Sequence, residues 1–159
     1  METWKALEDL YKSKKVRAIG VSNFLPHHLN NLLERTSITP MVNQLEFHPG
    51  YIQKAAVDFC KQMGIQIEAW SPIGRARVLK EPFLMELAEK YQVSVAQICI
   101  RFALQCGVLP LPKSSSGERM HQNLDVFGFD IEENDMYQLM TLPQIGWSGE
   151  HPDRERVRF

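Results

Sequence analysis

Four short apolar runs, each followed by a segment with helical character, dominate the sequence. The runs are rich in β-branched and aromatic residues, as buried strands are, and they occupy residues 16–21, 42–47, 65–70 and 108–111. Segments that we interpret as helices cover residues 2–13, a stripe from Pro26 to Leu33, and residues 52–63, 82–91, 94–106, 117–124 and 132–142. A helix followed by four strand–helix repeats predicts an α/β fold with parallel strands joined by crossover helices.

Two architectures fit this order of elements, an open doubly wound sheet and a (β/α) barrel. No G-x-G-x-x-G motif follows the first run, which disfavours the dinucleotide-binding open sheet. Polar residues instead follow every run, namely Ser22-Asn23, Gln44-Glu46-His48, Ser71 and Lys113-Ser114. In a barrel these positions converge on one mouth, where active sites form.

A complete (β/α)8 barrel has eight strands and about 250 residues. The sequence therefore predicts one partial domain over residues 1–159, with about four strands and a tail loop at 143–159. The formal net charge is -1, from 18 basic and 19 acidic side chains, so we expect no nucleic-acid partner. No apolar run approaches the roughly 18 residues that span a bilayer, so we expect no membrane segment.

The three cysteines, Cys60, Cys99 and Cys106, form no C-x-x-C pair. We interpret them as buried free thiols of a reducing compartment, which predicts a cytoplasmic protein. The amphipathic first residues do not resemble a signal peptide.

A basic, polar group begins at the end of the fourth run with Lys113 and Ser114 and continues through Arg119 and Asn123. Two positive charges, a hydroxyl and the free N–H groups of a helix N-terminus suit a phosphate dianion. Asn123 lies four residues after Arg119, on the same helix face, where it could contact an adenine edge. When Lys113 and Arg119 are taken alone, we interpret them as solvated surface charges.

Ser22, Asn23 and Gln44 form a second polar group, at the ends of the first two runs. Such side chains are costly inside a barrel mouth unless they are paired, and a carboxamide ligand would pair them. Capping of a turn is the alternative for Ser22-Asn23. Trp70 could stack on a flat ring or pack in the core.

Ser71 and Gly74 could let the backbone approach a pyrophosphate. His48 is expected to make a structural hydrogen bond at a strand end. His27 and His28 are expected to lie solvated at the start of a helix. The histidines and carboxylates show no spacing that predicts a metal site, and no nucleophile elbow or P-loop is present.

Together these strings resemble the aldo-keto reductase family. The matching strings, in family order over almost the whole chain, are Gly20-Val21-Ser22-Asn23-Phe24, Asn43-Gln44-Leu45-Glu46-Phe47-His48-Pro49, Trp70-Ser71-Pro72-Ile73-Gly74, and Pro112-Lys113-Ser114 with Arg119 and Asn123. The short segment after Gly74 and the ending Gly149-Glu150-His151-Pro152-Asp153 resemble the bacterial branch, which reduces small aldehydes, dicarbonyls and keto-sugars.

The resemblance implies a (β/α)8 barrel that binds NADPH in an extended form and reduces aldehydes and ketones to alcohols. Ser22, Asn23 and Gln44 would hold the nicotinamide carboxamide, and Trp70 would stack on its ring. The remaining implied contacts are Ser71, Ile73 and Gly74 at the pyrophosphate, Lys113, Ser114 and Arg119 at the 2′-phosphate, and Asn123 at the adenine. Gln122 stands where relatives often have a Glu facing the adenine, which would weaken one contact.

The family's catalytic Asp, Tyr, Lys and His lie on its first four strands, and no motif here matches them. We therefore expect a truncated half that is nearly inactive alone, whose exposed sheet edges favour self-association. The alternative is a non-catalytic NADPH-binding or self-associating half-barrel module. The small carbonyl substrate would belong to the full-length protein, and Trp147 is the candidate here for covering the mouth.

Overall fold

The computed structural model describes residues 2–154, in which four strands form one sheet. Strands β1 (Gly20–Ser22), β2 (Val42–Glu46), β3 (Gln66–Trp70) and β4 (Leu109–Leu111) lie in sequence order. β1 pairs with β2 in parallel, with Gly20 opposite Val42 and Ser22 opposite Gln44. Parallel neighbours need a crossover connection, which the intervening helices supply. The predicted α/β fold, half of a barrel, is confirmed.

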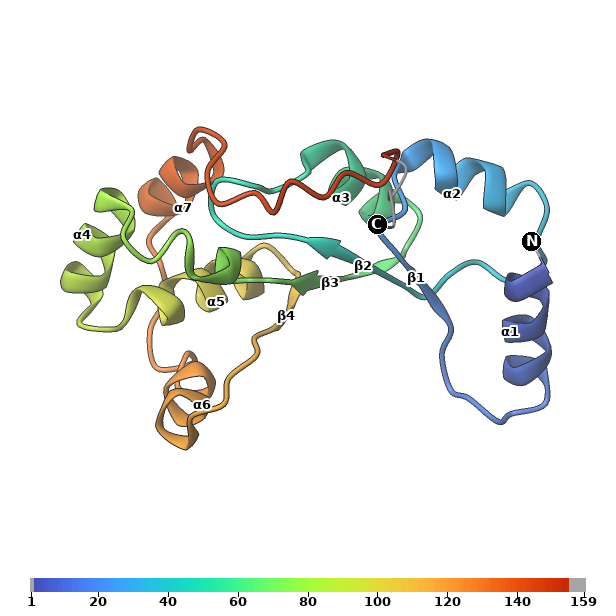
Figure 1. Cartoon of the computed structure of the whole chain (residues 1–159), viewed down its shortest axis with the longest axis horizontal. Helices are drawn as coiled ribbons and strands as arrows, with labels where there is room; N and C mark the ends of the chain where they lie inside the picture. Colours follow the sequence, from blue (N-terminus) through green and yellow to red (C-terminus); the bar gives the residue numbers. More distant parts are fainter. Residues whose placement is uncertain (1, 155–159) are drawn as a thin grey trace, which may run out of the picture. The chain divides into compact units, whose positions relative to one another are not determined.

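One helix precedes β1, and the other helices lie between and after the strands (Figure 1). They are α1 (Glu2–Lys12), α2 (Pro26–Leu33), α3 (Lys54–Gln62), the 3-10 helix η1 (Gly74–Ala76), α4 (Pro82–Tyr91), α5 (Val95–Gln105), α6 (Gly117–Leu124) and α7 (Glu133–Met140). Within residues 2–154, no helix has the length and apolar character needed to cross a bilayer.

The chain divides into two compact units, and the first contains residues 2–45, 54–68 and 150–154 of the described chain. Its core is formed by Trp4, Ile19 and Leu32, which lie under partly buried apolar side chains. Helix α2 contacts α3 in this unit. Glu8 of α1 accepts hydrogen bonds from the backbone N–H groups of Ser37 and Ile38, at 2.9 Å and 2.8 Å, and so holds the loop before β2.

The second unit contains residues 46–53 and 69–149. Helix α5 is central to it, because α5 contacts α4, α6 and β4 (Figure 1). Phe47 and Phe102 stack in its core with ring centroids 5.7 Å apart. Asp135 of α7 accepts from Lys90 Nζ at 2.8 Å and from the Tyr91 hydroxyl at 2.6 Å, which joins α7 to α4.

Several element boundaries differ from those predicted. The first strand covers Gly20–Ser22 instead of 16–21, and residue 20 approaches the second strand so closely that an added Cβ would lie 2.6 Å from the Val42 carbonyl oxygen. Helix α3 begins two residues later than predicted, because Gln53 has a left-handed φ of 45°. Helix α5 begins at Val95, one residue later than predicted, and Ser94 is its N-cap. The η1 turn was not predicted.

Candidate functional site

Ser22, Asn23 and Gln44 are brought together in the first unit. Ser22 and Gln44 are partners in the parallel pair of β1 and β2, so their side chains project to the same face of the sheet. The Gln44 carbonyl oxygen accepts two hydrogen bonds, from the Asn23 N–H at 2.9 Å and from the Ser22 hydroxyl at 3.2 Å. This pairing satisfies the backbone of the turn and leaves the Gln44 side chain to other partners.

The turn after β1 is held by Asn43, a residue whose role the sequence did not reveal. Asn43 is fully buried, and its Nδ2 donates to the Phe24 carbonyl at 2.8 Å while its Oδ1 accepts from the Phe24 N–H at 3.3 Å. Asn23, just before Phe24, has a left-handed φ of 59°, which Asn tolerates better than most residues. Asn43 therefore fixes the conformation that presents Asn23.

Glu68 of β3 is a second neighbour that the motifs did not single out. The side-chain Nε2 of Gln44 donates to Glu68 Oε2 at 3.0 Å, and both side chains are half-buried. An ionised carboxylate only accepts hydrogen bonds, so the Gln44 amide must turn its NH2 group toward Glu68. The only sequence signal for this contact was the placement of a carboxylate two residues before Trp70.

In the second unit, the loop after β3 carries Trp70, Ser71, Ile73 and Gly74. Its backbone is unusual, since Ser71, Gly74 and Arg75 have φ values of 51°, 55° and 51°. Residues other than glycine rarely adopt such φ values, and strained backbone of this kind is often found at ligand-binding sites. An added Cβ at Gly74 would lie 2.9 Å from Val78 Cγ1, so the backbone at Gly74 packs closely against the side chain of Val78.

Trp70 is half-buried and not a fully enclosed core residue. The Arg75 guanidinium carbon lies 5.3 Å from the centroid of its ring system, within the range of a cation–π contact. The stacking of Trp70 on a flat ligand ring stays a prediction.

The basic group lies around the start of α6, also in the second unit. Ser116 is the N-cap and accepts from the Arg119 N–H at 3.4 Å, while Ser114 Oγ accepts from the Ser116 N–H at 3.2 Å. No residue of α6 is buried, and the side chains of Lys113 and Arg119 are both exposed. Gln122 is exposed on the same helix and Asn123 is half-buried. Positive charge beside a helix N-terminus suits an anion.

The segment that contains Trp147 is held by Glu46, which is 1% exposed. Ser148 donates to this carboxylate through its N–H at 2.9 Å and its hydroxyl at 2.7 Å. The Trp147 carbonyl accepts from Arg77 Nη1 at 2.7 Å, and its ring stacks on Tyr51 at 5.9 Å. Burial, with the Glu46 charge as the second cause, raises the pKa of Tyr51.

His48 is fully buried beside Glu46. Its Nδ1 lies 2.9 Å from the Pro49 carbonyl oxygen, and its Nε2 lies 3.6 Å from Glu46 Oε1. A carbonyl can only accept, so Nδ1 carries a proton. The predicted structural hydrogen bond of His48 at a strand end is confirmed.

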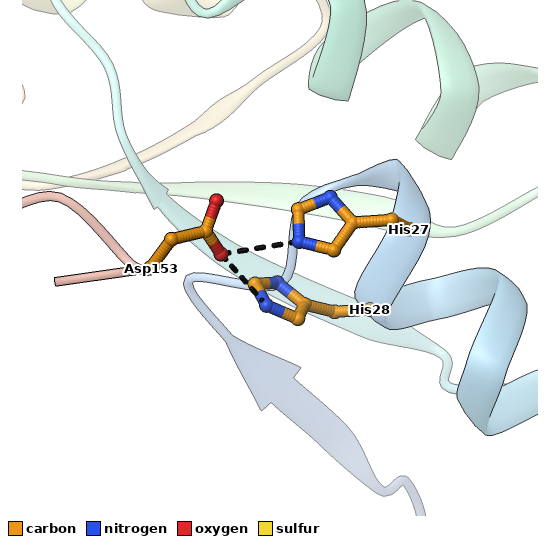
Figure 2. Close-up of side chains that lie close together, drawn as sticks. All are labelled: His27, His28 and Asp153. Carbon is orange, nitrogen blue, oxygen red and sulfur yellow. Dashed lines mark hydrogen bonds and ion pairs between the residues drawn. The ribbon is translucent and has the colours of Figure 1, made fainter. Parts of the chain in front are cut away.

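His27 and His28 lie at the start of α2, as predicted, and the predicted solvation is confirmed for the exposed His27, whereas His28 is half-buried. Both rings point at Asp153, whose Oδ1 lies 3.1 Å from His27 Nε2 and 2.9 Å from His28 Nε2 (Figure 2). The three ligand atoms lie within 4.8 Å of one another, as in a metal site. However, His28 Nδ1 accepts from the Leu25 N–H at 3.1 Å, so the ring must carry its proton on Nε2 and donate it to Asp153.

A metal ion would need the lone pair of His28 Nε2, which this hydrogen bond removes. The three side chains therefore form a hydrogen-bonded latch between the first turn of α2 and the tail.

The described cysteines are free thiols; Cys60 and Cys99 are buried, and burial raises the pKa of Cys99 to about 12.

Comparison with known proteins gives a consistent picture. A profile of the aldo/keto reductase family matches residues 1–142. Glyoxal reductase of Bacillus subtilis (strain 168) is 48% identical over 152 residues, which are 96% of this chain and 55% of that protein. The chain thus spans about half the length of the curated relatives it matches.

Solved structures agree with this match. The apo form of Gox0644 superposes with a TM-score of 0.93 at 40% identity, over 98% of this chain and 58% of that one. A variant of Gox0644 in complex with NADPH gives a TM-score of 0.84 at 43% identity, over 87% of this chain and 51% of that one.

Proposed function

The chain belongs to the aldo-keto reductase family, and from that premise we propose that it supplies the NADP-binding part of a reductase that converts small aldehydes and ketones to alcohols. The observation that carries the proposal is the match over residues 1–142 to a family in which a relative 43% identical is solved with NADPH. All the residues proposed below to contact the cofactor lie inside the matched residues.

Each unit offers its own contacts to the cofactor under this proposal. Ser22, Asn23 and Gln44 of the first unit bind the nicotinamide carboxamide. In the second unit, Trp70 stacks on the nicotinamide ring and the loop after it contacts the pyrophosphate. The second-unit contacts are Ser71, Ile73 and Gly74 for the pyrophosphate, Lys113, Ser114 and Arg119 for the 2′-phosphate, and Gln122 and Asn123 for the adenine.

NADP is proposed over NAD because two exposed cations flank the start of α6. NADH lacks the 2′-phosphate that Lys113 and Arg119 would pair with. The loss of such a charge-assisted contact weakens binding by about tenfold or more. The cofactor, when bound, supplies the hydride, and the residues named here bind and orient it.

We propose that the 159-residue chain forms one partial domain of a cytoplasmic enzyme, whose tail loop covers 143–159; residues 155–159 lie outside the described residues. Trp147 is the proposed cover of the substrate mouth. The name of the glyoxal reductase relative supports a small carbonyl substrate. We propose that none of the described residues takes the role of the family's proton donor, so the chain is expected to turn over carbonyls at least about 100-fold more slowly than a full-length relative.

A second candidate is a binding module that pairs with another chain through its strand edges. β1 and β4 end the strand order, and Leu109 and Leu111 of β4 are 48% and 46% exposed. An exposed apolar edge strand favours association with another strand. Sedimentation of the purified chain tests this candidate: dimers or larger species support it, and a clean monomer contradicts it.

The main proposal is tested by assaying the chain for NADPH binding and for NADPH-dependent reduction of glyoxal. The expected result is quenching of tryptophan fluorescence by NADPH, reduced in Trp70→Phe, together with turnover far below that of a full-length relative. Turnover equal to the relative contradicts the assignment of low activity, and an absence of quenching at millimolar NADPH contradicts the cofactor site.

A further inference from the structure

We propose that Glu68 sets the direction of the Gln44 side-chain amide and thereby makes the cofactor subsite beside Ser22 selective for a carboxamide over a carboxylate or a ketone. This inference rests on the proposed function, in which Ser22, Asn23 and Gln44 bind the carboxamide of NADPH. Glu68 is a positioning residue, because it acts through Gln44.

The direction of the Gln44 amide follows from the chemistry of its partner. Gln44 Nε2 lies 3.0 Å from Glu68 Oε2. A reversed amide would place Oε1 against the carboxylate, two acceptors in contact, and would leave the NH2 group without this charge-assisted bond. Gln44 therefore commits a donor to Glu68 and keeps Oε1, an acceptor, for a ligand.

The Ser22 hydroxyl, like the Gln44 side chain, is left with only an acceptor to offer to a ligand. A serine hydroxyl has one proton, and Ser22 donates it to the Gln44 carbonyl oxygen at 3.2 Å. The same carbonyl also accepts from the Asn23 N–H at 2.9 Å, which holds the turn against β2. The Ser22 oxygen is left with lone pairs alone to offer to a ligand.

Two neighbouring groups thus both present acceptors on one face of the sheet. Ser22 is directly opposite Gln44 in the parallel ladder, so the two are close enough to share one ligand group. A primary carboxamide has two N–H groups and can pair with both acceptors. A carboxylate or a methyl ketone in that place has no proton to give and faces unpaired acceptors, which is the condition under which polar sites discriminate strongly.

The test uses the wild-type chain and three reduced ligands: NADPH, its analogue with nicotinic acid in place of nicotinamide, and its 3-acetylpyridine analogue. Dissociation constants come from quenching of tryptophan fluorescence. We expect NADPH to bind at least about tenfold more tightly than either analogue, because both analogues leave acceptors unpaired. Equal affinities would overturn the inference without any variant being needed.

Glu68→Gln tests the positioning role. A glutamine can donate as well as accept, so Gln44 can reverse its amide and offer a donor to the carboxylate analogue. In this variant we expect the dissociation constants of NADPH and of its nicotinic acid analogue to differ by less than about threefold. A difference of that size is within the range of a single lost hydrogen bond. Glu86→Gln, on the exposed side of α4, is the matched control and leaves the ratio unchanged.

The ratio of affinities, and not the affinity alone, carries the test, since a general loss of structure lowers both affinities together. A folded Glu68→Gln chain that keeps the wild-type ratio overturns the positioning role. A wild-type chain that binds none of the three ligands contradicts the proposed function itself, and this outcome is distinct from equal binding of all three.

Discussion

The carboxylate of Glu46 accepts two hydrogen bonds from Ser148, one from the backbone N–H at 2.9 Å and one from the hydroxyl at 2.7 Å. Glu46 ends β2 and is 1% exposed. Ser148 directly follows Trp147, so a buried acid at a strand end fixes the backbone next to the residue proposed to cover the substrate mouth.

Glu46→Gln should destabilise the chain and loosen the Trp147 segment. The NH2 group of the new side chain would face one of the two Ser148 donors, and a buried donor left unpaired costs about 1–3 kcal/mol. Urea unfolding measures the loss, and a red shift of tryptophan emission reports the looser segment. The exposed control Glu86→Gln should change stability by less than about 0.5 kcal/mol. Equal stability of both variants would show that the Glu46 contact contributes little.

Asp135 should make stability depend on acid pH. Burial alone raises its pKa, but hydrogen bonds from Lys90 and Tyr91 outweigh burial and lower it. A lowered folded pKa gives stability that is present above the unfolded value, about 3.9, and is lost as pH falls through the folded value.

The expected result is a stability difference between wild type and Asp135→Asn that is constant near neutral pH and shrinks below about pH 4. The hydrogen bond to Asp135 raises the pKa of Lys90. The contribution of Lys90 to the free energy of unfolding is therefore fully present below about pH 10.4 and is lost only as pH rises through the raised pKa. Urea unfolding from acid to alkaline pH measures both limits. Asp9→Asn, an exposed change on α1, is the control, and a pH-independent difference for Asp135→Asn would contradict the assignment.

Arg119→Ala should weaken NADPH binding by about 10- to 100-fold and leave NADH binding nearly unchanged, since it removes a charge-assisted contact to the 2′-phosphate alone. Titration with each cofactor measures the two constants. Arg35→Ala, a basic residue between α2 and β2, serves as a charge-matched control. Equal weakening of both cofactors by Arg119→Ala would remove the 2′-phosphate role.

The latch on Asp153 should depend more on His28 than on His27. The His28 side chain is 31% exposed and its Nδ1 is fixed by Leu25, whereas the His27 side chain is 61% exposed. Coupling in an exposed pair is commonly below about 1 kcal/mol, and it grows with burial and fixed geometry. Double-mutant cycles of each histidine with Asp153, measured by urea unfolding, give the two coupling energies. A larger coupling for His27 would contradict the tautomer assigned to His28.

The sequence predicted the order of elements because apolar runs and helical stripes encode it locally. It also predicted the basic group around α6. It placed the first strand too early, since the observed strand begins at Gly20, the residue that pairs with Val42 of β2. Pairing between residues that are far apart in the chain is not encoded in the local pattern of apolar residues.

Within the candidate site, the motifs identified Ser22, Asn23 and Gln44 as polar residues at strand ends. They did not predict the roles of Asn43 and Glu68, whose contacts join separate strands or a strand and a turn. The His28 to Asp153 contact was missed for the same reason, since its partners are far apart in the chain. Partner identity in these cases is set by tertiary packing, which a single sequence does not display.

The proposed function requires that this chain hold NADPH with its own residues. Calorimetric titration of the purified chain with NADPH, and separately with NADH, measures this binding. We expect saturable binding of one NADPH per chain and affinity for NADH lower by about tenfold or more. No heat of binding at millimolar NADPH, or equal affinity for the two cofactors, would contradict it.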